Sequence, residues 1–218
     1  MPTEQPERNN KMIITSINLS AGENEVFIYG SEGEKFRISV ADAKRAGVYK
    51  FIESPELLPE EADEEMLDFM TKKLSCVSYA AYLLEFGDKS KKVLTMKLKA
   101  KGYEIDVCEA ALDVLEKSGI IDDERLCSSK LVSIANAKYY GPYRLKAELI
   151  NKGFSSRQIE NALDDAEIDF DELLRALVEK LTVRGFPEDE KGLSSLKNKL
   201  SRYGYSYESI NCVLEEYM

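Results

Sequence analysis

The chain has 218 residues, and its 40 Asp and Glu against 30 Lys and Arg leave a formal net charge of −10 at pH 7. This excess of acidic residues argues against tight, non-specific binding to nucleic acid by the protein alone, because such binding depends mainly on cations that contact phosphates. The absence of histidine and the wide spacing of the four cysteines exclude a Cys/His zinc site and a Ser-His or Cys-His catalytic pair. We therefore expect a protein that is not an enzyme and that carries no metal and no cofactor.

The first ten residues are polar and predict a disordered tail. They lack the basic-then-apolar order of a signal peptide, and no apolar run in the sequence reaches the eighteen or so residues that a membrane span needs. We therefore expect a cytoplasmic protein without membrane contact.

Alternation of apolar and polar residues follows the tail, in MIITSINL (12–19), NEVFIYG (24–30) and EKFRISV (34–40). This period of two predicts a small meander of two or three β-strands. A short helix that ends at a glycine is expected at 40–47. The acidic, proline-bounded segment 55–66 is expected to be a linker or the start of a helix.

From about residue 67 onward the hydrophobic period is that of helices, and one sequence pattern occurs three times. The copies are KLKAKGYEIDVCEAAL from Lys97, ELINKGFSSRQIENAL from Glu148 and KLSRYGYSYESINCVL from Lys199. Further amphipathic helices precede the copies, at 66–86, 123–137 and 170–183. Each unit of the repeat is thus predicted to contain a leading helix, a middle helix, a corner and a third helix.

The corner of each copy is predicted from a glycine followed by an aromatic residue. The glycines recur every 51 residues, at Gly102, Gly153 and Gly204. A glycine one residue past a helix end, followed by an apolar residue, is typical of a Schellman motif. We expect Ser90 to cap the first middle helix, Ser155 and Gln158 to form a capping box, and Ser206 to cap the last helix. In the first copy Asp106, together with Glu109, is expected to replace the weaker Glu104 as the cap.

The predicted fold is mainly α, with three tandem three-helix repeats behind a small β-rich module. The expected boundaries are 1–10 for the tail, 11–66 for the β-rich module, and 67–119, 120–168 and 169–218 for the repeats. A unit of this size buries little alone, so neighbouring units must stack on one another.

Basic residues gather on the middle helix of every unit, and acidic residues gather on the third helix. The candidate partner-binding residues are Lys97, Lys99, Lys101, Tyr140, Arg144, Lys146, Lys152, Lys197, Lys199 and Arg202. A run of charge is most often only a solvated helix face. Three basic helices in register favour a stripe suited to phosphates or to an acidic groove on a protein.

Two shorter features have a structural and a functional interpretation. Tyr139 and Tyr140 precede Gly141 and Pro142, and they either stack on a partner or seal a loop against the core. The acidic residues 122–124 begin a helix, which favours capping over metal binding.

The segments AAYLLEF (80–86), GIIDDERL (119–126) and YGPYRLKAELINKGF (140–154) resemble the RecX family of recombination regulators. The similarity covers about residues 74–217, and the preceding strand-rich module resembles the N-terminal extension of longer members.

The resemblance implies a modular, non-catalytic and monomeric protein that binds the RecA recombinase. RecX proteins lie in the groove of the RecA filament on single-stranded DNA, and most of them inhibit ATP hydrolysis and strand exchange. Whether single-stranded DNA within the filament is contacted directly stays open. The alternatives are an independent DNA-binding protein with helix-turn-helix-like units and a helical scaffold that binds only proteins.

Overall fold

The structure is a computed structural model and describes residues 11–217. The tail expected at 1–10 lies outside the described residues. The chain divides into two compact units. One unit holds the residues up to 86 together with 95–118, and the other holds 87–94 together with the residues from 119 onward.

An antiparallel sheet begins the first unit. Its strands are β1 (Lys11–Leu19), β2 (Glu25–Gly30), β3 (Lys35–Ser39) and β4 (Glu60–Asp63), in the order β3-β2-β1-β4. Alternate residues of the first three strands are buried, as the period of two predicts. The register between β1 and β2 shifts between Ile14 and Ser16, where a bulge interrupts the ladder.

Of the two alternatives expected for segment 55–66, the linker is wrong and the start of a helix is confirmed for its last residues. It contains a short 3₁₀ helix at Pro55–Leu57, the strand β4 and the start of α3 (Glu64–Glu85). Strand β4 pairs with β1 from Lys11↔Asp63 to Ile14↔Glu60, so the sheet has four strands and not two or three. A strand that pairs through its backbone at a sheet edge needs no apolar alternation, and acidic side chains suit such an edge.

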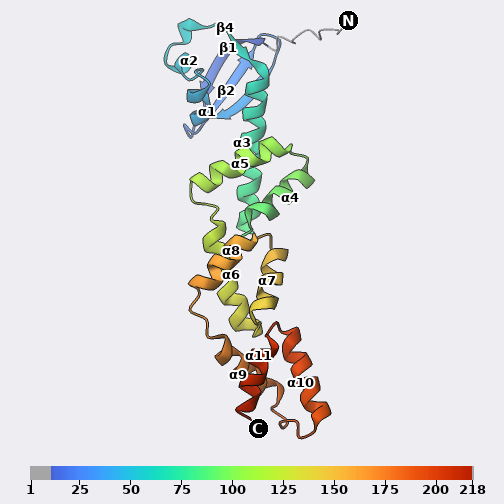
Figure 1. The fold of residues 1–218 in the computed structure, drawn as a ribbon. Helices are drawn as coiled ribbons and strands as arrows, with labels where there is room; N and C mark the ends of the chain where they lie inside the picture. The colour runs from blue at the N-terminus through green and yellow to red at the C-terminus, as the bar shows by residue number, and fades with distance from the viewer. Residues whose placement is uncertain (1–10, 218) are drawn as a thin grey trace, which may run out of the picture. The chain divides into compact units, whose positions relative to one another are not determined.

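Helices α1 (Val40–Arg45), α2 (Lys50–Glu53) and α3 lie beside the sheet (Figure 1). They share one hydrophobic core with it. The core joins strand residues such as Ile14, Val26 and Ile38 to Phe51 of α2 and Leu67 of α3. Lys73 of α3 and Asp42 of α1 form a buried ion pair, with the ammonium nitrogen 2.5 Å from a carboxylate oxygen. The long helix α3 is therefore tied to the β-rich module by both apolar and ionic contacts.

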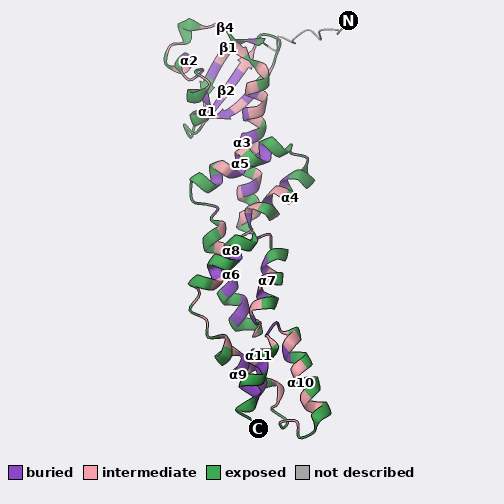
Figure 2. Ribbon diagram, in the orientation of Figure 1, coloured by how far each residue is buried: buried purple, intermediate pink, exposed green. Residues whose placement is uncertain are grey.

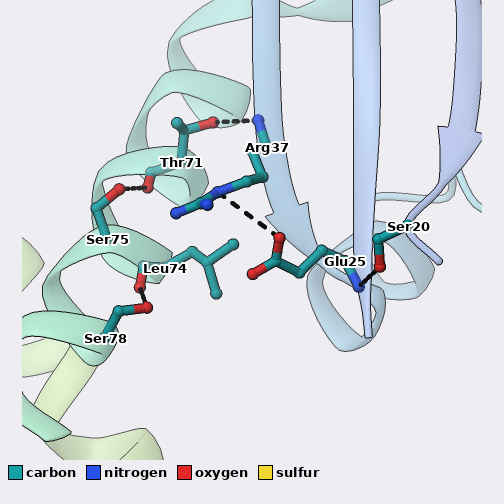
Figure 3. A network of polar contacts seen from close by, with 7 residues as sticks. All are labelled: Ser20, Glu25, Arg37, Thr71, Leu74, Ser75 and Ser78. Atoms are coloured by element: carbon teal, nitrogen blue, oxygen red, sulfur yellow. Dashed lines mark hydrogen bonds and ion pairs between the residues drawn. The ribbon is translucent and has the colours of Figure 1, made fainter. Parts of the chain in front are cut away.

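Polar contacts also hold α3 beside the edge of β3 (Figure 3). The backbone N–H of Arg37 donates to the hydroxyl of Thr71 at 3.2 Å, and the Arg37 guanidinium lies 3.8 Å from the Glu25 carboxylate. Thr71 thus occupies a donor that an edge strand otherwise leaves to water. Helix α5 (Ile105–Lys117) packs against α3 further along the chain, within the same unit.

The second unit contains two three-helix groups. The first group is α6 (Asp123–Lys138), α7 (Pro142–Asn151) and α8 (Ser156–Asp165). The second group is α9 (Phe170–Leu181), α10 (Glu190–Arg202) and α11 (Tyr207–Glu215). Each group has its own buried cluster, around Leu131 and Leu149 in the first and around Leu177 and Leu200 in the second (Figure 2). The predicted fold class, mainly α with three-helix repeats behind a β-rich module, is confirmed; the exact repeat boundaries stay a prediction.

Most of the predicted helix ends are confirmed. Ser155 and Gln158 form the complete capping box of α8, and Ser206 accepts from the N–H of Ser209 at 3.0 Å. The prediction for Asp106 is wrong, because α5 begins at Ile105 after Glu104, which makes no side-chain cap bond. None of the helices within residues 11–217 combines the length and apolarity that crossing a bilayer requires.

Candidate partner-binding surface

The middle helices of the three copies bury leucines at matching positions. These helices are α4 (Lys91–Lys101), α7 and α10. Their buried leucines are Leu94 and Leu98, Leu145 and Leu149, and Leu196 and Leu200. A helix that buries positions four residues apart turns the intervening positions outward. The lysines and arginines of these helices are therefore exposed or half-buried.

The glycine corners have the left-handed backbone that the sequence predicts, with φ of 104° at Gly102, 94° at Gly153 and 95° at Gly204. In the first two copies the N–H of the following aromatic donates to the leucine carbonyl five residues back, at 3.2 Å in both cases. This is the longer bond of a Schellman motif. The corner glycines differ in what surrounds them, however.

The N-terminus of α4 docks on the corner of the second copy, and we call this contact the first joint. The Ser90 hydroxyl donates to the Lys152 carbonyl at 2.7 Å and is 3.4 Å from the Val93 N–H, which it caps. The Asp123 carboxylate accepts from the N–H of Lys91 at 2.9 Å. Ser90 is buried, and a side chain on Gly153 would collide with it.

The N-terminus of α7 docks in the same way on the corner of the third copy, and we call this contact the second joint. The N–H of Gly141 donates to the Tyr203 carbonyl at 2.9 Å, and the N–H of Tyr143 donates to the Gly204 carbonyl at 3.2 Å. The buried Tyr205 donates its hydroxyl to the Tyr139 carbonyl at 3.2 Å. A helix start and a helix end thus meet at each joint. Their unsatisfied backbone groups bond to side chains at the first joint and to each other at the second.

The second joint brings basic and aromatic side chains around one pocket of about 470 Å³. Its lining residues are Ala137, Lys138, Tyr140, Arg144, Lys180, Arg202 and Tyr203. The rings of Tyr140 and Tyr203 meet edge to face, with centroids 5.9 Å apart. The charged groups of Lys138 and Arg144 lie 5.2 and 5.4 Å from the centroid of the Tyr140 ring, within the range of cation–π attraction.

Three of the predicted site residues, Tyr140, Arg144 and Arg202, meet in this pocket. Lys199 is exposed on α10 and, with Arg202, borders an open depression that Asp189 and Glu190 also border. Lys197 is half-buried on the same helix.

The remaining predicted residues do not join the pocket. Lys152 lies at the first joint, where its carbonyl accepts from Ser90. Lys146 is 4.0 Å from Glu160 of α8, so its charge has an acidic neighbour. Lys97, Lys99 and Lys101 are exposed in the first unit, where the ammonium of Lys101 lies 5.4 Å from the centre of the Tyr79 ring.

Sequence reasoning missed Lys138, Lys180 and Tyr203 as site residues. A signal was present for Tyr203, because it stands before the corner glycine where the other copies have Lys101 and Lys152. Lys180 belongs to the leading helix α9, which has no cluster of cations that would have indicated a binding site. Its ammonium is 4.6 Å from the centre of the Tyr139 ring.

The tyrosines before α7 are half-buried, which confirms that they seal the loop against the core; their stacking on a partner stays a prediction. Tyr139 has a left-handed backbone, with φ of 56°, and packs against the core of the third copy. Tyr140 packs against the core of the second copy and also lines the pocket. Tyr143, which was not singled out, is the exposed one, at 68%.

The acidic residues 122–124 cap helices, as expected. Asp122 accepts from the N–H of Arg125 at 2.9 Å, and Asp123 caps α4 at the first joint. Among residues 11–217 no group of three or more metal-ligating side chains is arranged to hold a metal ion. Burial raises the pKa of the Cys127 thiol to about 11, so this cysteine is unsuited to nucleophilic chemistry.

The fold and surface define a helical-repeat protein with basic middle helices. A family model described as the first three-helix domain of RecX matches residues 76–115. Regulatory protein RecX of Pseudomonas fluorescens is 34% identical over 121 residues, which cover 56% of this chain and 77% of that protein. Regulatory protein RecX of Stenotrophomonas maltophilia is 34% identical over 134 residues, which cover 62% of this chain and 82% of that protein.

Two solved structures share the fold. A crystal structure of regulatory protein RecX aligns with a TM-score of 0.72 at 19% identity, over 94% of this chain and 99% of that one. RecX from Lactobacillus salivarius aligns with a TM-score of 0.61 at 22% identity, over 66% and 96%. The chain belongs to the RecX family of regulatory proteins, as the sequence motifs indicated.

Proposed function

We propose that this protein binds the RecA recombinase filament on single-stranded DNA and inhibits its ATP hydrolysis and strand exchange. The observation that carries the proposal is membership of the RecX family, with relatives named regulatory protein RecX matched over most of their length. The role is one of binding, without catalysis by the protein itself.

The arrangement of the repeats supports a binding role. A filament presents the same surface many times, and a chain of similar units can engage several copies of that surface at once. Weak contacts made by each unit then sum to a tight complex. Within the second unit, the second joint sets the spacing of the middle helices α7 and α10.

We propose that the contacts come from the basic middle helices. The candidate residues are Lys97, Lys99, Lys101, Tyr140, Arg144, Lys146, Lys152, Lys197, Lys199 and Arg202. Exposed cations on an otherwise acidic protein favour an acidic or phosphate-bearing partner surface.

The direct test is the rate of ATP hydrolysis by RecA on single-stranded DNA with increasing amounts of this protein. We expect the rate to fall as the protein is added. We expect the double variant Lys146→Glu/Lys152→Glu to inhibit at least about tenfold less well, because two favourable charges become repulsive. A rate that the native protein leaves unchanged at saturating amounts would refute the proposal.

Arg157→Glu/Arg184→Glu is a matched control, since it makes the same change of charge at exposed arginines outside the middle helices. Inhibition that falls equally in both double variants would show that only the net charge matters. Unchanged inhibition by Lys146→Glu/Lys152→Glu would remove those two residues from the contact surface.

A second candidate function is DNA binding that needs no RecA, and the basic pocket at the second joint favours it. Salt-titrated binding to duplex and single-stranded DNA in the absence of RecA separates the two functions. A protein that binds DNA by itself shows a steep loss of affinity with salt. Against this candidate stands the net charge of −10.

A further inference from the structure

The pocket at the second joint is made by cations that are far apart in the sequence. Lys138 ends α6, Arg144 is in the first turn of α7, Lys180 is in the last turn of α9 and Arg202 ends α10. All four side chains are exposed, so their charges are accessible to a ligand. Four helices of two repeats contribute one cation each, which a solvated face of a single helix cannot do.

Aromatic rings hold three of the four cations. Lys138 and Arg144 lie against Tyr140, and Lys180 lies against Tyr139. A cation that already rests on a ring has fewer orientations to lose when it binds an anion. The pocket is therefore partly organised without its ligand.

Carboxylates do little to balance these charges. The lining residues include no Asp or Glu. Within the described residues, Arg144 is the one cation of the four with a carboxylate in ion-pair range, and the Glu148 oxygen is 3.7 Å away. Like charges around one cavity repel each other, and a bound anion relieves that repulsion.

Phosphate is the anion that suits the pocket best. Guanidinium groups match phosphate oxygens with paired hydrogen bonds, and lysines add point charges. A single carboxylate carries too little charge for four cations. The volume of about 470 Å³ exceeds that of a phosphate group alone, and Tyr140 and Tyr203 add aromatic surface on which a base can stack.

We propose that Lys138, Arg144, Lys180 and Arg202 form a phosphate-binding pocket for a nucleotide unit, with the base against Tyr140 and Tyr203. The phosphate comes from a single-stranded polynucleotide or from a free nucleotide. This site deepens the second candidate function, because it names the residues and the phosphate chemistry of binding that needs no RecA. A failure of the test below leaves the proposed regulation standing, and a failure to inhibit RecA leaves the pocket standing.

The test uses the full chain without RecA and a fluorescent oligothymidylate of eight nucleotides, with binding measured by anisotropy at low salt. We expect Arg144→Gln/Arg202→Gln to weaken binding about tenfold or more, because each lost phosphate contact costs at least a charged hydrogen bond. The slope of log affinity against log salt should also fall by roughly 0.7 for each lost contact with a single strand. Inorganic pyrophosphate should compete for the site.

The matched control is Arg184→Gln/Lys191→Gln, which removes one exposed cation before α10 and one in its first turn, neither of which lines the pocket. We expect a change of less than about twofold for it. If Arg144→Gln/Arg202→Gln does not fold, Lys138→Gln/Lys180→Gln replaces it, since the backbone bonds of the joint are made by Gly141 and Tyr143 and not by either lysine. Equal losses in the control and in the pocket variant would overturn the proposal.

Two competitors complete the test. If poly-glutamate competes as well as pyrophosphate at equal charge, the pocket is not selective for phosphate and the proposal is overturned. The proposal is also overturned if neither the oligonucleotide nor ADP binds. ADP that binds as tightly as the oligonucleotide supports the pocket and assigns it to a free nucleotide. An oligonucleotide that binds more tightly than ADP supports it and assigns it to a single strand.

Discussion

The two joints of the second unit have the same geometry but different chemistry. At both, the first residues of a middle helix dock on the glycine corner of the next copy. The first joint is closed by a buried serine hydroxyl, whereas the second is closed by backbone bonds and a buried tyrosine. At the second joint, tyrosines and cations surround a pocket.

The difference teaches that the repeated corner provides the contact between repeats, while the residues next to it decide what the contact can bind. The corner of the first copy serves as a natural reference. Within the described residues, a side chain added at Gly102 would meet no neighbouring atom, whereas one at Gly204 would collide with the backbone of Arg144. Gly102 thus has the same left-handed backbone as the other two corner glycines, but no helix start is packed against it within the described residues.

The largest expected effect is that of Gly204→Ala. The substitution combines a left-handed backbone with a collision at the second joint, and we expect it to destabilise the protein by about 3 kcal/mol or more. Gly102→Ala has only the backbone cost, about 1 to 2 kcal/mol. Urea unfolding followed by circular dichroism measures both. Equal losses in the two variants would mean that the corner glycine plays no part in the joint.

Ser90→Ala tests the first joint. It removes a buried hydrogen bond to Lys152 together with the cap of α4, for which we expect a loss of about 2 kcal/mol. Ser155→Ala is the control, because it removes the cap of α8 at an exposed position where the hydroxyl bonds only within α8, with a loss of about 1 kcal/mol. A loss for Ser90→Ala no larger than for the control would contradict a role of its hydroxyl in docking.

Tyr205→Phe tests the second joint with a smaller change. It removes the hydroxyl that donates to the Tyr139 carbonyl and should cost about 1 kcal/mol at neutral pH. Burial raises the pKa of Tyr205 above its usual value near 10, so the folded state favours the neutral phenol. Its contribution to stability is therefore complete below pH 10 and is lost as the pH rises above that value.

The pH dependence of the free energy of unfolding tests whether Tyr205 loses its stabilising contribution above pH 10. The loss of stability above pH 10 should be smaller in Tyr205→Phe than in the native protein, since the variant lacks one phenol that resists ionisation. Identical alkaline profiles for the two proteins would show that Tyr205 ionises as easily in the folded state as in the unfolded state.

The smallest effect is expected for Lys152→Gln in the assay of oligonucleotide binding. Lys152 lies at the first joint, outside the pocket, so we expect the affinity to change by less than about twofold. A loss comparable with that of Arg144→Gln/Arg202→Gln would mean that both joints bind the ligand. Ligand binding would then not distinguish the second joint from the first.

Features that depend on neighbours in the sequence were predicted well. Ser155 and Gln158 are three residues apart, and their capping box formed as predicted. A glycine corner likewise needs only a helix end and an apolar residue after it. The strand β4 was not predicted, because an edge strand that pairs through its backbone leaves no pattern in its side chains. Asp106 failed as a cap because α5 starts at Ile105, two residues earlier than a cap at Asp106 requires.

By itself, the sequence determined the period of 51 residues, the left-handed corners and the outward direction of the basic residues on the middle helices. Hydrogen bonds and packing within a few residues decide these features, so local patterns reveal them. The tertiary structure alone decided which cations meet. Lys138, Lys180 and Arg202 are separated by more than a helix in sequence and come together only because the start of α7 docks on the corner at Gly204.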